Sequence, residues 1–107
     1  MPKQGAIVLV PFPFTDLTAA KVRPAVVLSA KLVKSDVVLA FISSKQKQEE
    51  YNVAIAPSKT NGLRVPSVII CSKLATLEKT VLLGELGFVE DDILKQLKAK
   101  LKLLFDM

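Results

Sequence analysis

The sequence has no histidine, no tryptophan and a single cysteine, and these shortages exclude several kinds of chemistry. Without histidine there is no Ser-His-Asp triad, and the commonest general base and zinc ligand are missing. Cys71 has no second cysteine for an internal disulfide, and its apolar neighbours favour a buried, inert thiol. The aspartates lack metal-binding spacing, which disfavours two-metal phosphoryl transfer. We therefore expect no metal and no cofactor.

Long apolar runs are also missing. No run approaches the roughly 20 residues that span a bilayer, and the start, Met1-Pro2-Lys3-Gln4, does not resemble a signal peptide. These two observations predict a cytoplasmic protein without membrane contact. The length of 107 residues predicts one domain, residues 1–107.

The chain is rich in lysine and in apolar residues. Its formal charge of +5 favours polyanionic partners, nucleic acid first. Of the 15 basic residues only Arg23 and Arg64 are arginines, which sets these two positions apart, because lysine can supply charge alone. Half of the residues are apolar, a large share for so small a chain. That share predicts either a dense core or, in preference, apolar surface that is buried against another subunit.

Short apolar segments bounded by turn residues predict a series of strands. We expect strands at residues 6–12, 23–29, 37–43, 52–56, 67–71 and 80–83. Residues 72–77 fit either a short helix or a continued strand. Asn61-Gly62 indicates a turn, and Gly84 and Gly87 predict another turn around Glu85-Leu86.

Residues 90–105 carry the one clear helical pattern. Ile93, Leu97, Leu101 and Phe105 recur at four-residue spacing. Acidic residues begin the segment and lysines follow, which suits the helix dipole, with an acid as the N-cap, Asp91 in preference. Several short strands followed by one helix predict a mainly β (α+β) fold, in which a compact antiparallel sheet curls.

Charged and hydroxyl residues gather at the predicted strand ends and loops. The candidates are Thr15, Asp16, Lys21, Arg23, Ser43, Ser44, Lys45, Lys47, Arg64 and Lys73. A curled sheet brings alternate loops to one rim, so these residues would line a basic groove. Pro24 biases the preceding Arg23 toward an extended backbone, which holds its position.

A basic groove with hydroxyl groups suits RNA, because RNA carries its own nucleophile, the 2′-hydroxyl. An arginine can neutralise the phosphorane, and a serine hydroxyl can bond a phosphate oxygen. The expected products are a 2′,3′-cyclic phosphate and a 5′-hydroxyl. The general base is not identified: Glu49, Glu50 and the lysines are candidates. The alternative to a catalytic role for Arg23 is a purely structural one, namely a salt bridge with Asp16.

Residues 5–29, GAIVLVPFPFTDLTAAKVRPAVVLS, resemble the opening of the MazF/PemK family of toxin endoribonucleases. The stretches VVLAFISS and KAKLKLLF extend the likeness over nearly the whole chain. The resemblance implies an SH3-like curled barrel with a C-terminal helix, usually homodimeric, that cuts single-stranded RNA at short sequences without metal. It also implies a cognate antitoxin protein whose disordered tail blocks the RNA groove.

The resemblance assigns roles by position. Arg23 matches the family's catalytic arginine, and Ser43 matches its catalytic threonine, keeping the hydroxyl without the methyl group. The remaining eight candidates would bind RNA. Ala6 and Pro11 stand where some members have an acid.

Two other functions fit the same fold. One is a non-catalytic binding module, either for RNA or as a gyrase inhibitor like CcdB, which predicts gyrase inhibition with RNA left intact. The other is a structural oligomerisation domain, which predicts dimers without RNA affinity across salt concentrations.

Overall fold

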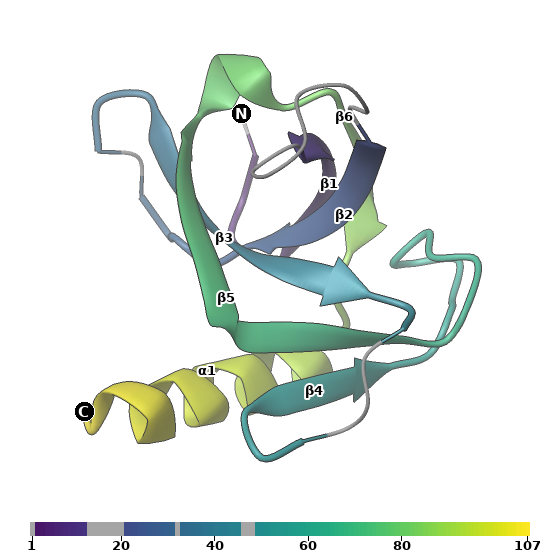
Figure 1. Cartoon of the computed structure of the whole chain (residues 1–107), viewed down its shortest axis with the longest axis vertical. Coiled ribbons are helices and arrows are strands. Elements are labelled where there is room, and N and C mark those ends of the chain that lie inside the picture. Colours follow the sequence, from purple (N-terminus) through teal and green to yellow (C-terminus); the bar gives the residue numbers. More distant parts are fainter. Residues whose placement is uncertain (1, 13–20, 32, 46–48) are drawn as a thin grey trace.

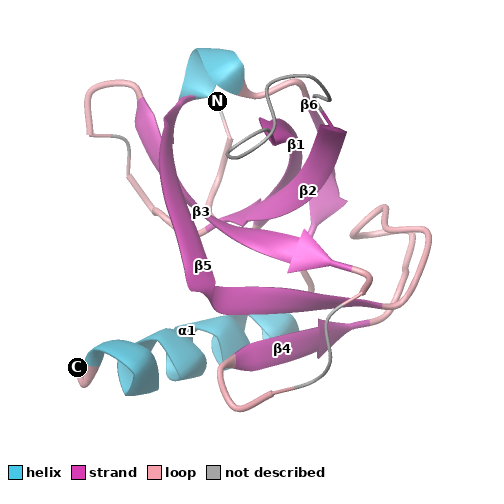
Figure 2. Cartoon of the chain, in the orientation of Figure 1, coloured by secondary structure: helices cyan, strands magenta, loops and turns pink. Residues whose placement is uncertain are grey.

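The computed structural model describes residues 2–12, 21–31, 33–45 and 49–107. Strands make up most of the regular structure in the described chain, and one α-helix follows them (Figures 1 and 2). The elements are β1 (Ala6–Phe12), β2 (Lys21–Val27), β3 (Asp36–Ser43), β4 (Asn52–Ile55), β5 (Ser67–Glu78), the 3₁₀ turn η1 (Lys79–Val81), β6 (Gly84–Phe88) and α1 (Asp91–Phe105).

The strands form one antiparallel sheet in the order β4-β5-β3-β2-β1-β6. The long strand β5 gives the sheet its curl. Its register against β3 shifts between Ala40 and Phe41, and there β5 bends away from β4 and rises to η1 (Figure 1). The predicted mainly β fold, a curled antiparallel sheet with a C-terminal helix, is confirmed.

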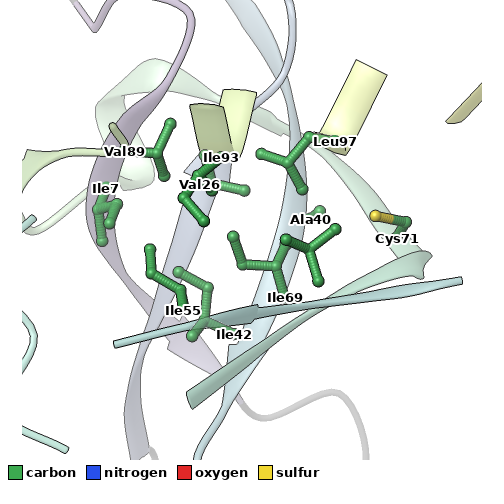
Figure 3. Close-up of a cluster of buried hydrophobic side chains, with 11 residues drawn as sticks. Ile7, Val26, Ala40, Ile42, Ile55, Ile69, Cys71, Val89, Ile93 and Leu97 are labelled. Carbon is green, nitrogen blue, oxygen red and sulfur yellow. The ribbon is translucent and has the colours of Figure 1, made fainter. Parts of the chain in front are cut away.

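Alternate residues of the strands build a core on each face of the sheet. On one face, α1 packs its Ile93 and Leu97 against strand residues that include Ile42, Ile55 and Ile69 (Figure 3). The other face carries a second buried cluster: Ala6, Val8, Val10, Ala25, Val27, Val37, Leu39 and Phe41. Strand β1 contributes to both clusters, with Ile7 in the first and Ala6, Val8 and Val10 in the second.

Helix α1 departs from the sequence prediction at both ends. Its N-cap is Glu90, so the assignment of Asp91 was wrong by one residue. Phe105 is 53% exposed instead of completing the apolar stripe, because the last turn of α1 projects past β4 (Figure 1). Of the helices that the structure describes, none has the length and apolar character needed to cross a membrane.

The sheet departs from the prediction mainly after β5. Residues 72–77 continue β5, which resolves the open alternative. The predicted strand 80–83 is wrong, because Lys79–Val81 form a 3₁₀ turn. The predicted turn at Gly84 and Gly87 is also wrong, because both glycines lie in β6. Two glycines give β6 little intrinsic strand preference, and its pairing with β1 is what defines it.

Candidate functional site: two pockets that meet at Arg23

Arg23 and Ser43 lie level with each other at the ends of two neighbouring strands. Arg23 is half-buried in β2, and the antiparallel register pairs Ala25 of β2 with Phe41 of β3. The pairing ends there, and Arg23 and Ser43 each lie two residues beyond this last pair, in the same direction along the sheet. Because both residues sit on hydrogen-bonded strands, their backbone positions are well defined.

One pocket at this point carries most of the positive charge. It has a volume of about 240 Å³ and is lined by Arg23, Phe41, Ile42, Ser43, Lys45, Ile70 and Lys73. We call it the basic pocket. Three cations line it, and none of its described lining residues is acidic. Such a concentration of one charge attracts phosphate groups.

The polar groups of the basic pocket are oriented by backbone features. The Ser43 hydroxyl oxygen accepts a hydrogen bond from the backbone N–H of Lys45 at 3.1 Å. That leaves the hydroxyl hydrogen available to donate to a ligand. Lys73 belongs to the bend of β5, where the register against β3 shifts between Ala40 and Phe41. Such irregularities redirect side chains out of the regular sheet pattern.

A second pocket opens on the other side of the same strand ends. It has a volume of about 380 Å³, and its lining is mostly apolar, including Val22, Leu63 and Leu86, with Arg23 and Arg64 as its cations. We call it the apolar pocket. Ile42 lines both pockets, whereas Ser43 lines the basic pocket and the next residue, Ser44, lines the apolar pocket. Arg23 lines both pockets and marks where they meet.

One wall of the apolar pocket comes from the loop between β4 and β5, which is organised by Asn61. This side chain is fully buried. Its Oδ1 accepts from the backbone N–H groups of Ser58 at 3.0 Å and Leu63 at 2.9 Å. Its Nδ2 donates to the Ala56 carbonyl at 2.8 Å and to Glu90 Oε1 at 3.3 Å. The amide thus uses its full hydrogen-bonding capacity.

Glu90 connects this loop to helix α1. The Ser58 hydroxyl donates to Glu90 Oε2 and accepts from the Asn61 backbone N–H at 3.0 Å. The hydrogen bond from Ser58 lowers the pKa of the Glu90 carboxyl below its usual value, against a smaller opposing effect of burial. Although Glu90 is the N-cap residue, its side chain makes no capping hydrogen bond to α1. We call Ser58, Asn61 and Glu90 the clasp.

The same loop lies directly on the backbone of β6. A Cβ at Gly62, which has φ +71°, would come within 2.4 Å of the Leu86 carbonyl oxygen. A Cβ at Gly87 would come within 2.2 Å of the Thr60 carbonyl oxygen. The Phe88 N–H donates to that same Thr60 oxygen at 2.9 Å. Glycine is therefore required at both contacts, because no side chain fits between the two segments.

The structure divides the sequence-predicted residues between the two pockets. Arg23, Ser43, Lys45 and Lys73 meet in the basic pocket, and Arg23 meets Ser44 and Arg64 in the apolar pocket. Lys21 lies in β2, but its side chain, like Thr15, Asp16, Lys47 and the Phe12 and Phe14 side chains, is outside what the structure describes.

Several site residues were not singled out from the sequence. Leu63 and Leu86 of the apolar pocket read only as apolar residues of a loop and a turn. Asn61 was recognised as part of a turn, but nothing in the sequence signals its burial or its bond to Glu90. The proposed base candidates Glu49 and Glu50 are exposed and line neither of the two pockets among the described residues.

Cys71 and the acidic residues form no further chemical centre in the described ranges. Cys71 is buried in the core beneath α1, as predicted. Burial raises the pKa of its thiol, and the charge of Lys100 opposes this in part. No three Cys, Asp or Glu side chains of the described chain gather closely enough to hold a metal ion.

These features define a small basic protein with a curled sheet, a closing helix and a cationic site at its strand ends. The sequence profile of the PemK-like, MazF-like toxins of type II toxin–antitoxin systems matches residues 3–105. The chain therefore belongs to the PemK/MazF toxin family. A search of curated proteins finds no match to the sequence.

Solved structures share the fold at low sequence identity. An endoribonuclease from a mycobacterial species, solved with its cognate antitoxin, has a TM-score of 0.82 and 17% identity, covering 100% of this chain and 97% of its own. MazF from Deinococcus radiodurans has a TM-score of 0.78 and 23% identity, covering 99% and 97%. The Mycobacterium tuberculosis toxin MazF-mt6 has a TM-score of 0.75 and 23% identity, covering 95% and 97%. At such identities these likenesses establish the fold.

Proposed function

We propose that this protein is a toxin endoribonuclease that cuts single-stranded RNA without metal. The observation that carries the proposal is the convergence of Arg23, Ser43 and two lysines in one pocket at the strand ends. Membership of the PemK/MazF toxin family supports it, and so does the fold shared with a protein described as an endoribonuclease.

The chemistry follows from the groups that the basic pocket offers. The substrate's 2′-hydroxyl loses its proton to water as its oxygen attacks the neighbouring phosphorus, and the bond from phosphorus to the 5′-oxygen breaks as that oxygen takes up a proton. The products are a 2′,3′-cyclic phosphate and a 5′-hydroxyl. Arg23 donates a bidentate fork to the phosphorane oxygens, and the Ser43 hydroxyl donates to one of them. The described lining groups able to protonate the leaving oxygen are Lys45 and Lys73.

The apolar pocket supplies a place for a base beside the scissile phosphate. RNA-binding proteins recognise single strands by accepting unstacked bases on apolar or planar groups. A pocket of about 380 Å³ that begins at Arg23 is placed for a base adjoining the reacting phosphate. Arg64 adds a cation and a planar donor at this pocket. In this proposal the apolar pocket, with Ser44, contributes to the choice of cleavage sequence.

The biological setting of the proposal is cytoplasmic, with one domain that forms a homodimer. Val33, Leu83, Leu103 and Phe105 are each more than half exposed, which supports burial of apolar surface against a second copy. Family membership supports a cognate antitoxin as the second protein partner. Light scattering of the purified protein at micromolar concentration would show the mass of a dimer, and a monomer would contradict the assignment.

The test is incubation of the purified protein with a long single-stranded RNA in EDTA, beside Arg23→Ala. The expected result is cleavage at a recurrent short sequence, leaving 5′-hydroxyl ends, with the cuts lost in the variant. Circular dichroism shows that both proteins are folded. Cleavage that persists unchanged in Arg23→Ala would remove Arg23 from the mechanism. Intact RNA with the wild-type protein would overturn the endoribonuclease assignment, and gyrase inhibition would then favour the CcdB-like alternative.

A further inference from the structure

We propose that the clasp formed by Ser58, Asn61 and Glu90 positions the RNA-binding wall of the apolar pocket. In this view Glu90, at the start of α1, is a positioning residue for Arg64. The inference rests on the proposed function and adds to it, because it assigns a role to residues that line neither the basic nor the apolar pocket.

Asn61 is buried within a loop that is otherwise largely exposed. Residues 59–60 and 64–66 are exposed, whereas Asn61 is fully buried. A loop has no strand ladder to pair its backbone groups, so those groups need other partners. Asn61 provides them, since it bonds the backbone of Ala56, Ser58 and Leu63. The Asn61 amide therefore supports the loop conformation at three backbone positions, together with the bond from the Gly62 N–H to the Ser58 carbonyl at 2.9 Å.

The Glu90 carboxylate binds the loop and does not cap its own helix. Helix N-caps favour Ser, Thr, Asp and Asn, whose short side chains bond the first helical N–H groups. Glu90 makes no such bond. Its two oxygens instead bind Ser58, 32 residues earlier, and Asn61, 29 residues earlier. This position therefore contributes to the loop in place of a cap for its own helix.

The clasp lies next in the chain to residues that line the apolar pocket. Gly62, Leu63, Arg64 and Val65 line the apolar pocket and follow Asn61 directly in the chain. The Leu63 N–H is held by Asn61 Oδ1 at 2.9 Å, one residue before Arg64. A displacement of about 1 Å in a group that binds the substrate can lower the reaction rate strongly, because the contacts must be aligned. Loosening the clasp would therefore move Arg64 relative to Arg23.

The experiment is a double-mutant cycle of Glu90→Gln with Arg64→Ala, measured as kcat and KM for RNA cleavage. Glutamine removes the charge and replaces one acceptor oxygen by a donor. We expect Glu90→Gln to raise KM about 10-fold and to change kcat less than about 2-fold. In the Arg64→Ala background the same substitution should change KM less than about 2-fold, because the group being positioned is gone.

The control is Asp92→Asn, which removes one charge from an exposed residue in the same first turn of α1. It should leave both constants within about 2-fold, because surface charges contribute little. Thermal melting shows that each variant is folded. If Glu90→Gln does not fold, Ser58→Ala takes its place in the cycle with the same expectation, because it removes the hydroxyl that donates to Glu90 and accepts from the Asn61 N–H.

The outcomes separate the two proposals. Wild-type protein that leaves RNA intact overturns the proposed function, and the positioning role with it. Wild-type protein that cuts, combined with a KM effect of Glu90→Gln that is equal in both Arg64 backgrounds, overturns the positioning role alone. An effect of Glu90→Gln on kcat alone, with KM unchanged, would also overturn the positioning role. A KM effect that vanishes in the Arg64→Ala background supports the inference.

Discussion

The two pockets that meet at Arg23 differ in charge, in size and in how they are built. The basic pocket, about 240 Å³, is formed mainly by β2, β3 and β5 and holds three cations. The apolar pocket, about 380 Å³, has one wall made by the loop between β4 and β5. Strand positions are fixed by the sheet, whereas a loop tolerates sequence change. In the proposed mechanism the reaction therefore occurs at the basic pocket, on the sheet, while the loop contributes to the choice of RNA.

The largest expected effect concerns Arg23, which belongs to both pockets. Arg23→Ala should lower the single-turnover rate at saturating RNA by about 10³-fold, because the phosphorane loses its bidentate donor. Arg23→Lys keeps the charge without the fork and should recover only part of the rate. Quenched-flow cleavage of a labelled RNA measures both. A drop of less than about 10-fold would mean that the phosphate reacts elsewhere.

The next effect separates the pockets through two adjacent serines. Ser43→Ala should lower kcat about 10²-fold by removing a donor to the phosphate. Ser44→Ala, its neighbour on the apolar side, should change kcat less than about 3-fold. Ser43→Thr should retain activity, because the hydroxyl is kept. Equal losses of kcat in Ser43→Ala and Ser44→Ala would contradict the proposal that the two pockets have different roles.

A third effect concerns the support of the apolar pocket. Gly87→Ala should lower the free energy of unfolding by about 2–3 kcal/mol, because the new methyl group meets the Thr60 carbonyl oxygen. Gly84→Ala is the matched control in the same strand, where an added Cβ has no neighbour within 4 Å. Urea denaturation compares the two. Equal stability of both variants would show that the loop is not held against β6.

A smaller effect distinguishes charge from shape in RNA binding. Lys73→Ala should weaken binding a few-fold and reduce the salt slope of log K by about 0.7, which is the loss of one phosphate contact on a single strand. Leu63→Ala in the apolar pocket should alter affinity without changing that slope. Anisotropy titrations at several salt concentrations, with a 2′-deoxy substrate that resists cleavage, provide the measurement. An unchanged slope for Lys73→Ala would place the phosphate outside the basic pocket.

The smallest effect is a pH dependence of stability from the clasp. The pKa of Glu90 is lower in the folded protein than in the unfolded chain, because Ser58 donates to the carboxylate. The unfolded state therefore binds more protons, and this contribution to stability is complete above the unfolded value of about 4.3. It is lost as pH falls through the lower, folded value. Glu90→Gln should remove this part of the acid sensitivity, whereas Asp92→Asn should leave it in place, as urea titrations at pH 3 to 7 would show.

Local sequence patterns were sufficient for elements whose residues favour one structure by themselves. The apolar, β-branched runs of β1 and β3 and the four-residue spacing in α1 predicted those elements almost to the residue. Strand β6 was missed, because two of its five residues are glycines and its partner β1 lies at the other end of the chain. One of these glycines, Gly87, packs closely against the Thr60 backbone, which no local pattern reveals.

The sequence allowed us to predict which residues gather at the candidate site better than how they are arranged there. Arg23 and Ser43 were predicted to share a groove at the strand ends, and the structure brings both into the basic pocket; their catalytic roles stay a prediction. That Ser43 and Ser44 serve different pockets follows from the alternation of the strand, once its end is known. The clasp was not predictable, because Glu90 and Asn61 are 29 residues apart and meet only when β6 and the loop are packed.

The pairing of β1 on both of its sides has a consequence for how the protein is made. β1 pairs with β2 within the first 30 residues, but its second neighbour is β6 at residues 84–88. During synthesis the N-terminal hairpin therefore waits for a partner that emerges much later, and contacts of this sequence separation slow folding. The wall that presents Arg64 is completed later still, because Glu90 follows β6 in the chain. Synthesis thus delivers the loop wall of the apolar pocket after the strands that carry Arg23 and Ser43.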